Sequence, residues 1–207
     1  RRLPPGALLP ALAMVFVCYG NGVFEAFGIV HLTGRGVSGG AGLGGAASVF
    51  TVIALVTFVG RFAGGALSDH LGPRPVGLGG TVLVLASYVV LGVASSFAVA
   101  ALGGVLLGLG LALVYPSLSL LAVRRVTPAE RGAGIGMVLA ALDLNFAIGP
   151  PLAGLLIGIS STGFALISAA GVSLLSVPVL LAAGNPPAGA DEHEGVVVAE
   201  ELPSAAV

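Results

Sequence analysis

The chain has 207 residues, of which 57% are hydrophobic and only 8% are charged, and its mean hydropathy is +1.10. Soluble domains carry charge on roughly a quarter of their residues, so a water-soluble fold could not bury this much apolar surface. The formal net charge of −1 comes without a long basic cluster, which argues against nucleic-acid binding. Cys18 is the single cysteine, which excludes a disulfide framework.

Six long apolar runs follow one another along the chain. They cover residues 8–32, 42–66, 77–93, 97–122, 133–159 and 162–183. A helix crosses a hydrocarbon layer of about 30 Å with about 20 residues, and each run has about that length. Because the runs are continuous and do not alternate apolar with polar residues, helices are favoured over barrel strands. The sequence therefore predicts an all-α integral membrane protein with six transmembrane helices in residues 8–183.

Arginine is the only basic residue type besides histidine, and its distribution predicts an orientation. With a cytoplasmic N-terminus, Arg35 alone lies outside and the other seven arginines lie inside, as the positive-inside rule requires. We therefore expect both termini on the cytoplasmic side of the plasma (inner) membrane. Residues 1–7 resemble a cytoplasmic linker that follows an upstream part. Residues 184–207 are rich in Pro, Gly, Ala and acids, a composition typical of a disordered tail or, alternatively, of a partner-binding segment.

Residues 64–74, GGALSDHLGPR, separate the second and third runs as a short loop. Gly65 and Gly72 suit places where backbones approach closely or take positive φ. Asp69 can accept hydrogen bonds from a neighbouring helix N-terminus, whose free N–H groups and dipole favour negative charge. A ligand that changes helix tilt would make or break this contact, so we expect a gating loop. A tight turn with a solvated Asp69 is the alternative.

This loop resembles the signature loop of the major facilitator superfamily, Gly-x-Leu-x-Asp-Arg-x-Gly-Arg-Arg, which recurs in both halves of those twelve-helix transporters. The matching residues are Gly65, Leu67, Asp69, Gly72 and Arg74, and Arg61, one turn before Gly65, also fits. His70 and Pro73 depart from the pattern, which weakens the charge network of the loop. The resemblance implies a bundle built from a 3+3 inverted repeat, which is one half of the full transporter fold.

A second stretch resembles the tenth and eleventh helices of the drug and sugar efflux branch. Tyr115-Pro116, a Pro-x-x-Arg-Gly loop at residues 128–132, Asp143-Leu144 and Gly149-Pro150 correspond to patterns common there, whereas Asn145 stands where glycine is usual. The Asp-Leu pattern and the polar tail imply the C-terminal half of the transporter.

Ionisable groups inside the membrane usually face a cavity or a partner, since a charge at mid-bilayer costs at least about 2.5 to 3.5 kcal/mol. Asp143 lies near the middle of the fifth run and Glu25 nearer the outer end of the first, one turn after Asn21. A low dielectric favours the neutral carboxyl, as a proton carrier requires. We expect substrate or proton binding at Asn21, Glu25, Tyr115, Asp143 and Asn145. Packing is the alternative for Asp143, Asn145 and Tyr115, and a solvated vestibule carboxylate for Glu25.

An enzyme is not expected. Residues 36–39, Gly-Val-Ser-Gly, match the nucleophile motif of six-helix intramembrane proteases, but no histidine occurs on a later helix to act as the base. The three histidines, at positions 31, 70 and 193, are too scattered for a metal site. No motif requires a cofactor.

The most probable activity implied by the resemblance is proton-coupled efflux of a small molecule by alternating access. The partners would be the small-molecule substrate, protons, the lipid bilayer and an N-terminal six-helix half, from the same full-length chain or a second copy. Two alternatives stay open. One is a proton symporter or facilitator for sugars or organic acids, and the other is a non-transporting membrane remnant or scaffold.

Overall fold

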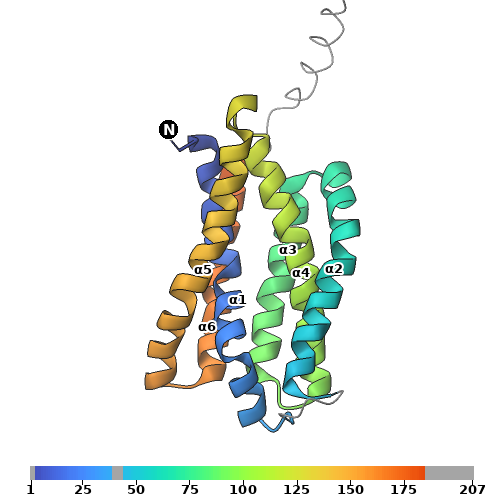
Figure 1. Cartoon of the computed structure of the whole chain (residues 1–207), viewed down its shortest axis with the longest axis vertical. Coiled ribbons are helices and arrows are strands. Elements are labelled where there is room, and N and C mark those ends of the chain that lie inside the picture. Colours follow the sequence, from blue (N-terminus) through green and yellow to red (C-terminus); the bar gives the residue numbers. More distant parts are fainter. Residues whose placement is uncertain (1–2, 39–43, 185–207) are drawn as a thin grey trace, which may run out of the picture.

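The computed structural model describes residues 3–38 and 44–184, and Figure 1 shows them as a bundle of roughly parallel rods. The helices are α1 Leu8–Gly34, α2 Ala46–Leu71, α3 Pro73–Val93, α4 Phe97–Val123, α5 Arg131–Ile159, α6 Thr162–Leu174 and α7 Ser176–Ala183, with single 3₁₀ turns η1 Pro5–Ala7 and η2 Pro128–Glu130. No strand occurs within these residues. The prediction of an all-α fold is confirmed.

The helices account for six apolar spans. Five are long and apolar enough to cross a membrane, among them the joined α6 and α7 as Thr162–Ala183. The sixth is α2, which bends by 44° between Ala46–Phe62 and Gly64–Leu71. The predicted linker at residues 1–7 contains the turn Pro5–Ala7, which leads directly into α1 and packs against the Arg125 backbone. The predicted tail from residue 185 onward lies outside the described residues.

Two boundaries differ from the prediction at the junction between the second and third helices. α2 continues to Leu71, and α3 begins at Pro73 and not at residue 77. Proline suits the first turn of a helix because its missing N–H would be unpaired there, so Pro73 begins α3 without cost. Gly72 alone joins the two helices, at φ +89° and ψ 152°. Residues that look like a loop in the sequence are therefore mostly helical.

The packing repeats itself between the two halves of the chain, as a 3+3 inverted repeat requires. In one group, α2 and α3 both pack against α4. In the other group, α5 and the pair α6 and α7 pack against α1 in the corresponding way. Two three-helix groups result, α2-α3-α4 and α1-α5 with α6-α7, and α3 also packs against α6. Figure 1 shows α2 and α5 on opposite sides of the bundle.

Close approach of α3 and α4 depends on glycine. A Cβ added at Gly80 would lie 3.0 Å from the Gly110 carbonyl oxygen and 2.9 Å from Val114 Cγ2, whereas one added at Gly79 would meet no atom within 4 Å. We expect Gly80→Ala to destabilise the bundle by about 1 kcal/mol through overpacking. A thermal unfolding scan in detergent should show a lower Tm for Gly80→Ala and an unchanged or slightly higher one for Gly79→Ala. If the two variants had the same Tm, the tight contact between Gly80 and α4 would be contradicted.

The two ends of the bundle carry different groups. At one end, Arg35, which follows the last residue of α1, donates from Nη2 to the Val93 carbonyl at 2.8 Å and from Nε to the Ala94 carbonyl at 3.2 Å. At the same end, His31 contacts Thr162 Oγ1 at 2.7 Å and the Leu91 carbonyl at 3.0 Å. These side chains donate to carbonyl groups at the C-terminus of α3, where the last carbonyl groups of a helix have few intrahelical donors. The loop between α4 and α5, with Arg125, lies at the opposite end.

Candidate functional site

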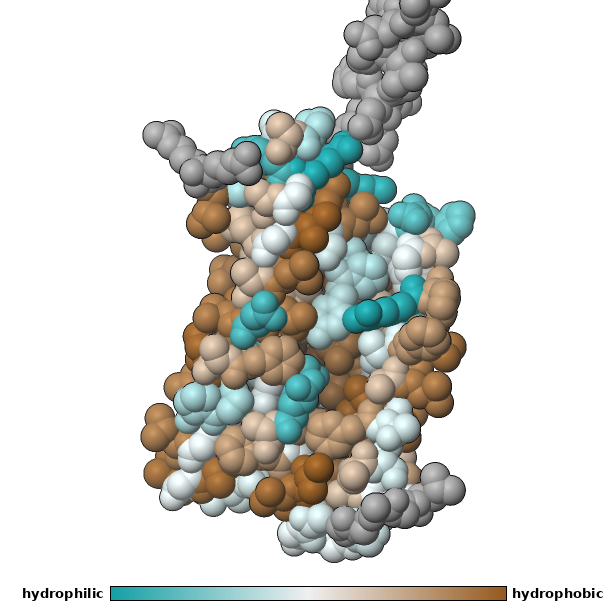
Figure 2. Space-filling model, in the orientation of Figure 1, coloured by the Kyte–Doolittle hydropathy of each residue, from teal (hydrophilic) through white to brown (hydrophobic). Residues whose placement is uncertain are grey.

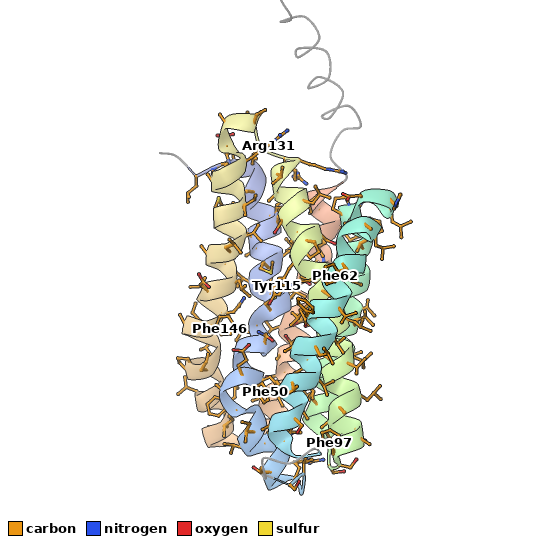
Figure 3. All side chains as sticks on the ribbon, turned by 45° about the vertical axis from the view of Figure 1, so that its right-hand side comes forward. Phe50, Phe62, Phe97, Tyr115, Arg131 and Phe146 are labelled. Carbon is orange, nitrogen blue, oxygen red and sulfur yellow. The ribbon has the colours of Figure 1, made fainter. Side chains whose placement is uncertain are left out.

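Two adjoining cavities of about 340 and 510 Å³, which share Arg61 and Tyr115 in their walls, form what we name the central pocket. Its lining comes from four helices. α1 contributes Met14, Asn21 and Glu25, α2 contributes Phe50, Thr57, Phe58 and Arg61, α4 contributes Leu111, Tyr115 and Ser119, and α5 contributes Leu139, Leu142 and Phe146. Figure 2 shows hydrophilic side chains in a hollowed part of this face, surrounded by apolar surface. In Figure 3, Tyr115 is labelled near the middle of the bundle, with Phe146 on the α5 side and Phe50 below it.

Glu25 and Asn21 form the polar part of the α1 wall. They are one helical turn apart, so both point to the same side of α1. Asn21 is buried and donates from Nδ2 to Glu25 Oε1 at 3.2 Å, while the Glu25 side chain is exposed on the pocket face. Among the residues that the structure describes, Asn21 is thus the one donor to the Glu25 carboxylate, which keeps lone pairs that face the open pocket.

Arg61 lies opposite, on α2, with its guanidinium carbon 5.6 Å from the centre of the Tyr115 ring. This distance allows a cation–π interaction. The sequence predicted that Arg61 flanks the gating loop, and the structure corrects this position. Because α2 continues to Leu71, Arg61 sits about 15 Å before the end of the helix, at 1.5 Å per residue. Arg61 thus lies within the α2 span and not at its end, which is a deeper position than the gating loop to which the sequence assigned it.

The predicted site residues divide into two sets. Asn21, Glu25 and Tyr115 line the central pocket together. Asn145 is buried and donates from Nδ2 to the Ala141 carbonyl at 3.1 Å and to the Met14 carbonyl at 3.4 Å, so it ties α5 to α1. Asp143 is exposed on α5 and is not part of the lining of the two cavities. At about 100° per residue, it lies beside the face that carries Leu139 and Phe146.

An aromatic pair bridges α1 and α2 next to Glu25. The rings of Phe24 and Phe50 are stacked, with 5.0 Å between centroids and 18° between planes. Phe24 is buried and Phe50 lines the pocket. The pair lies toward the Arg35 end, because Phe50 belongs to the first turns of α2.

The predicted gating loop is a helix junction. Gly65 is helical, and a Cβ there would meet no atom within 4 Å, so the expectation that it serves close approach or positive φ is wrong. Gly72 does have positive φ, as expected. Asp69 is exposed in the last turn of α2, and no hydrogen bond or ion pair joins it to another residue of the described ranges. Arg74 donates from Nη2 to the Leu181 carbonyl at 3.1 Å, which joins the start of α3 to α7.

Comparison with known proteins identifies the family to which this membrane bundle belongs. The family model of the Major Facilitator Superfamily matches residues 7–202. The chain belongs to the major facilitator superfamily. An uncharacterized MFS-type transporter of Burkholderia mallei (strain SAVP1) is 41% identical over 86 residues, which are 38% of this chain and 21% of the relative. The uncharacterized MFS-type transporter YhhS of Salmonella enteritidis PT4 is 28% identical over 176 residues, 84% of this chain and 41% of the relative.

Solved structures share the fold of this superfamily member. A peptide transporter POT in complex with sulfate superposes with a TM-score of 0.74 at 18% identity, over 95% of this chain and 44% of that one. A POT family transporter in complex with 5-aminolevulinic acid gives the same TM-score and identity, over 95% and 45%. At this identity the likeness shows the fold alone. The chain spans less than half the length of these relatives and structures. The matched family and the printed names of the relatives, which are MFS-type transporters, describe membrane proteins of this superfamily.

Proposed function

We propose that this chain is half of a proton-coupled secondary transporter that moves a small organic molecule by alternating access, with Glu25 as the proton carrier. The observation that supports this is the position of Glu25, a carboxyl group within a membrane helix whose side chain faces the central pocket and has Asn21 as its protein donor. Carboxyl groups at such depth usually serve ion or proton pathways. Substrate and proton would meet in this pocket.

An N-terminal six-helix half is proposed as the partner. The central pocket is open along the face formed by α1, α2, α4 and α5, where Phe58, Leu139 and Phe146 are exposed. A second bundle placed on this face would enclose the pocket, and rocking of the two halves would open it to either side. The second half would come from the same full-length chain or from a second copy.

Two coupling directions are candidates. Efflux in exchange for protons follows from the resemblance of residues 115–154 to the drug and sugar efflux branch. Symport of a proton with an organic acid is favoured by Arg61, since a cation in the same pocket as Glu25 can hold an acid group. In symport, protons and substrate enter the vesicle together, whereas in exchange they move in opposite directions.

Proteoliposomes that contain this chain and its N-terminal half test the proposal. They would carry an internal pH dye and receive glucose, 3-phenylpropanoate or ethidium under an imposed pH gradient. We expect at least one of these molecules to move with a proton flux that depends on its presence, and the direction of the flux identifies exchange or symport. Passive equilibration without proton flux would contradict proton coupling.

We also propose that both termini lie on the cytoplasmic side of the plasma (inner) membrane, as the arginine distribution predicts. In a Cys18→Ala background, Thr127→Cys and Ser160→Cys place single thiols at exposed positions at opposite ends of the bundle. An impermeant maleimide added to intact cells should label only Ser160→Cys, and in inverted vesicles only Thr127→Cys. The reverse pattern would refute the orientation.

A further inference from the structure

Arg61 presents an unneutralised positive charge to the central pocket. Its guanidinium lies over the Tyr115 ring, and no ion pair or hydrogen bond joins it to another residue in the described ranges 3–38 and 44–184. Arg35 and Arg74, by contrast, both donate to backbone carbonyls at the helix ends. A membrane-embedded cation ordinarily faces a partner of opposite charge or a water-filled cavity. At Arg61 the facing space is the pocket.

The one carboxylate in the pocket lining is held elsewhere. Glu25 accepts from Asn21 on its own helix, and it does not approach Arg61 within the 4.0 Å of an ion pair. Glu25 is about 14 Å before the end of α1 at Gly34, whereas Arg61 is about 15 Å before the opposite end at Leu71, so the two charges occupy different depths. Arg61 is therefore available to a ligand.

The walls around Arg61 are apolar and largely aromatic. Tyr115 lies beneath the guanidinium, and Phe58, Leu111 and Phe146 line the same cavity of about 510 Å³. The planar guanidinium offers five donors in a fork that matches a carboxylate in a bidentate manner. Sites that bury small molecules combine such apolar walls with a few placed polar groups.

We propose that Arg61 binds the acid group of an amphipathic organic anion, whose apolar body packs against the aromatic walls of the central pocket. The inference names a substrate class for the pocket and rests on the proposed transport function. The anion approaches Arg61 from the open face, and its ring or chain extends along α2 and α5 toward Phe58 and Phe146.

Three probes of one shape test the charge selection: 3-phenylpropanoate, 3-phenylpropanamide and 3-phenylpropylammonium. Binding to this chain together with its N-terminal half in lipid nanodiscs would be followed by isothermal titration calorimetry without any pH gradient. We expect saturable binding of 3-phenylpropanoate and at least about tenfold weaker binding of the amide and the ammonium, from the loss of a charge-assisted hydrogen bond. Arg61→Gln should remove this preference, Arg61→Lys should retain part of it, and Arg35→Gln should leave it unchanged because Arg35 lies outside the pocket.

Equal binding of the anion and the amide would overturn the inference, and so would an anion preference that survives Arg61→Gln. No saturable binding of any of the three probes would overturn it as well. The Tm of Arg61→Gln in the same nanodiscs should equal that of the unchanged protein. An equal Tm shows that a loss of binding is not a loss of folding. Because the assay needs no proton movement, anion binding without proton-coupled transport would refute the proposed function and leave this inference standing, and coupled transport of neutral molecules would do the opposite.

Discussion

Glu25→Gln is expected to abolish proton-driven transport while the protein inserts and folds normally. Glutamine has nearly the same shape as glutamate and can still accept from Asn21 Nδ2, so the local hydrogen bond is preserved. It cannot take up or release a proton, so coupling is lost. Accumulation of substrate under a pH gradient in proteoliposomes should fall to the level of empty vesicles, whereas exchange between equal substrate concentrations on the two sides should persist.

Asp143→Asn is the matched comparison for Glu25→Gln. Asp143 is the other carboxyl group that the sequence placed deep in the membrane, but its exposed side chain is not part of the pocket lining. If Glu25 carries the proton, Asp143→Asn should keep most of the proton-driven accumulation. Loss of coupling in Asp143→Asn with full coupling in Glu25→Gln would move the proton site to α5 and refute the assignment to α1.

Gly72→Ala should destabilise the junction of α2 and α3 and slow transport. The backbone of Gly72, at φ +89° and ψ 152°, lies in a region that only glycine adopts readily, and another residue there costs about 1–3 kcal/mol. Because a single residue joins the two helices, the strain cannot be relieved along a loop. The Tm in detergent and the initial transport rate in proteoliposomes measure the two effects.

Gly65→Ala is the control for this variant, since Gly65 belongs to the same signature but is helical, and a Cβ there meets nothing within 4 Å. Alanine in a helix is favoured over glycine by up to about 1 kcal/mol, so its Tm should stay the same or rise slightly. A loss of stability in Gly65→Ala as large as in Gly72→Ala would show that the signature acts through features other than backbone conformation.

The sequence predicted the fold class and the membrane spans because these depend on long apolar runs, which are visible without tertiary information. It failed where a helix end was at issue. Residues 64–71 contain glycines and polar residues typical of a turn, yet they continue α2 after a bend of 44°, since glycine is tolerated in membrane helices. The error in the end of α2 also hid the depth of Arg61.

The site was only partly predictable, because helical faces are set by packing partners. Glu25 and Asn21 share a face by their spacing alone, and the structure places both in the central pocket. Asn145 and Asp143 are two residues apart and therefore point to different sides of α5. Which side would face the pocket depends on how α5 packs along α1, through the bonds of Asn145 to the Met14 and Ala141 carbonyls. No pattern in the sequence contains that information.

The stacked rings of Phe24 and Phe50 join helices from the two three-helix groups, on the Arg35 side of Glu25. Such a stack contributes about 0.5–1.5 kcal/mol beyond its buried area, which is only one to three times the thermal energy. Separating the rings would also expose Phe24, which is buried in the bundle. If the proposed pathway opens toward the Arg35 end between α1 and α2, its cargo would have to pass this pair, and replacing Phe50 by alanine would admit wider molecules.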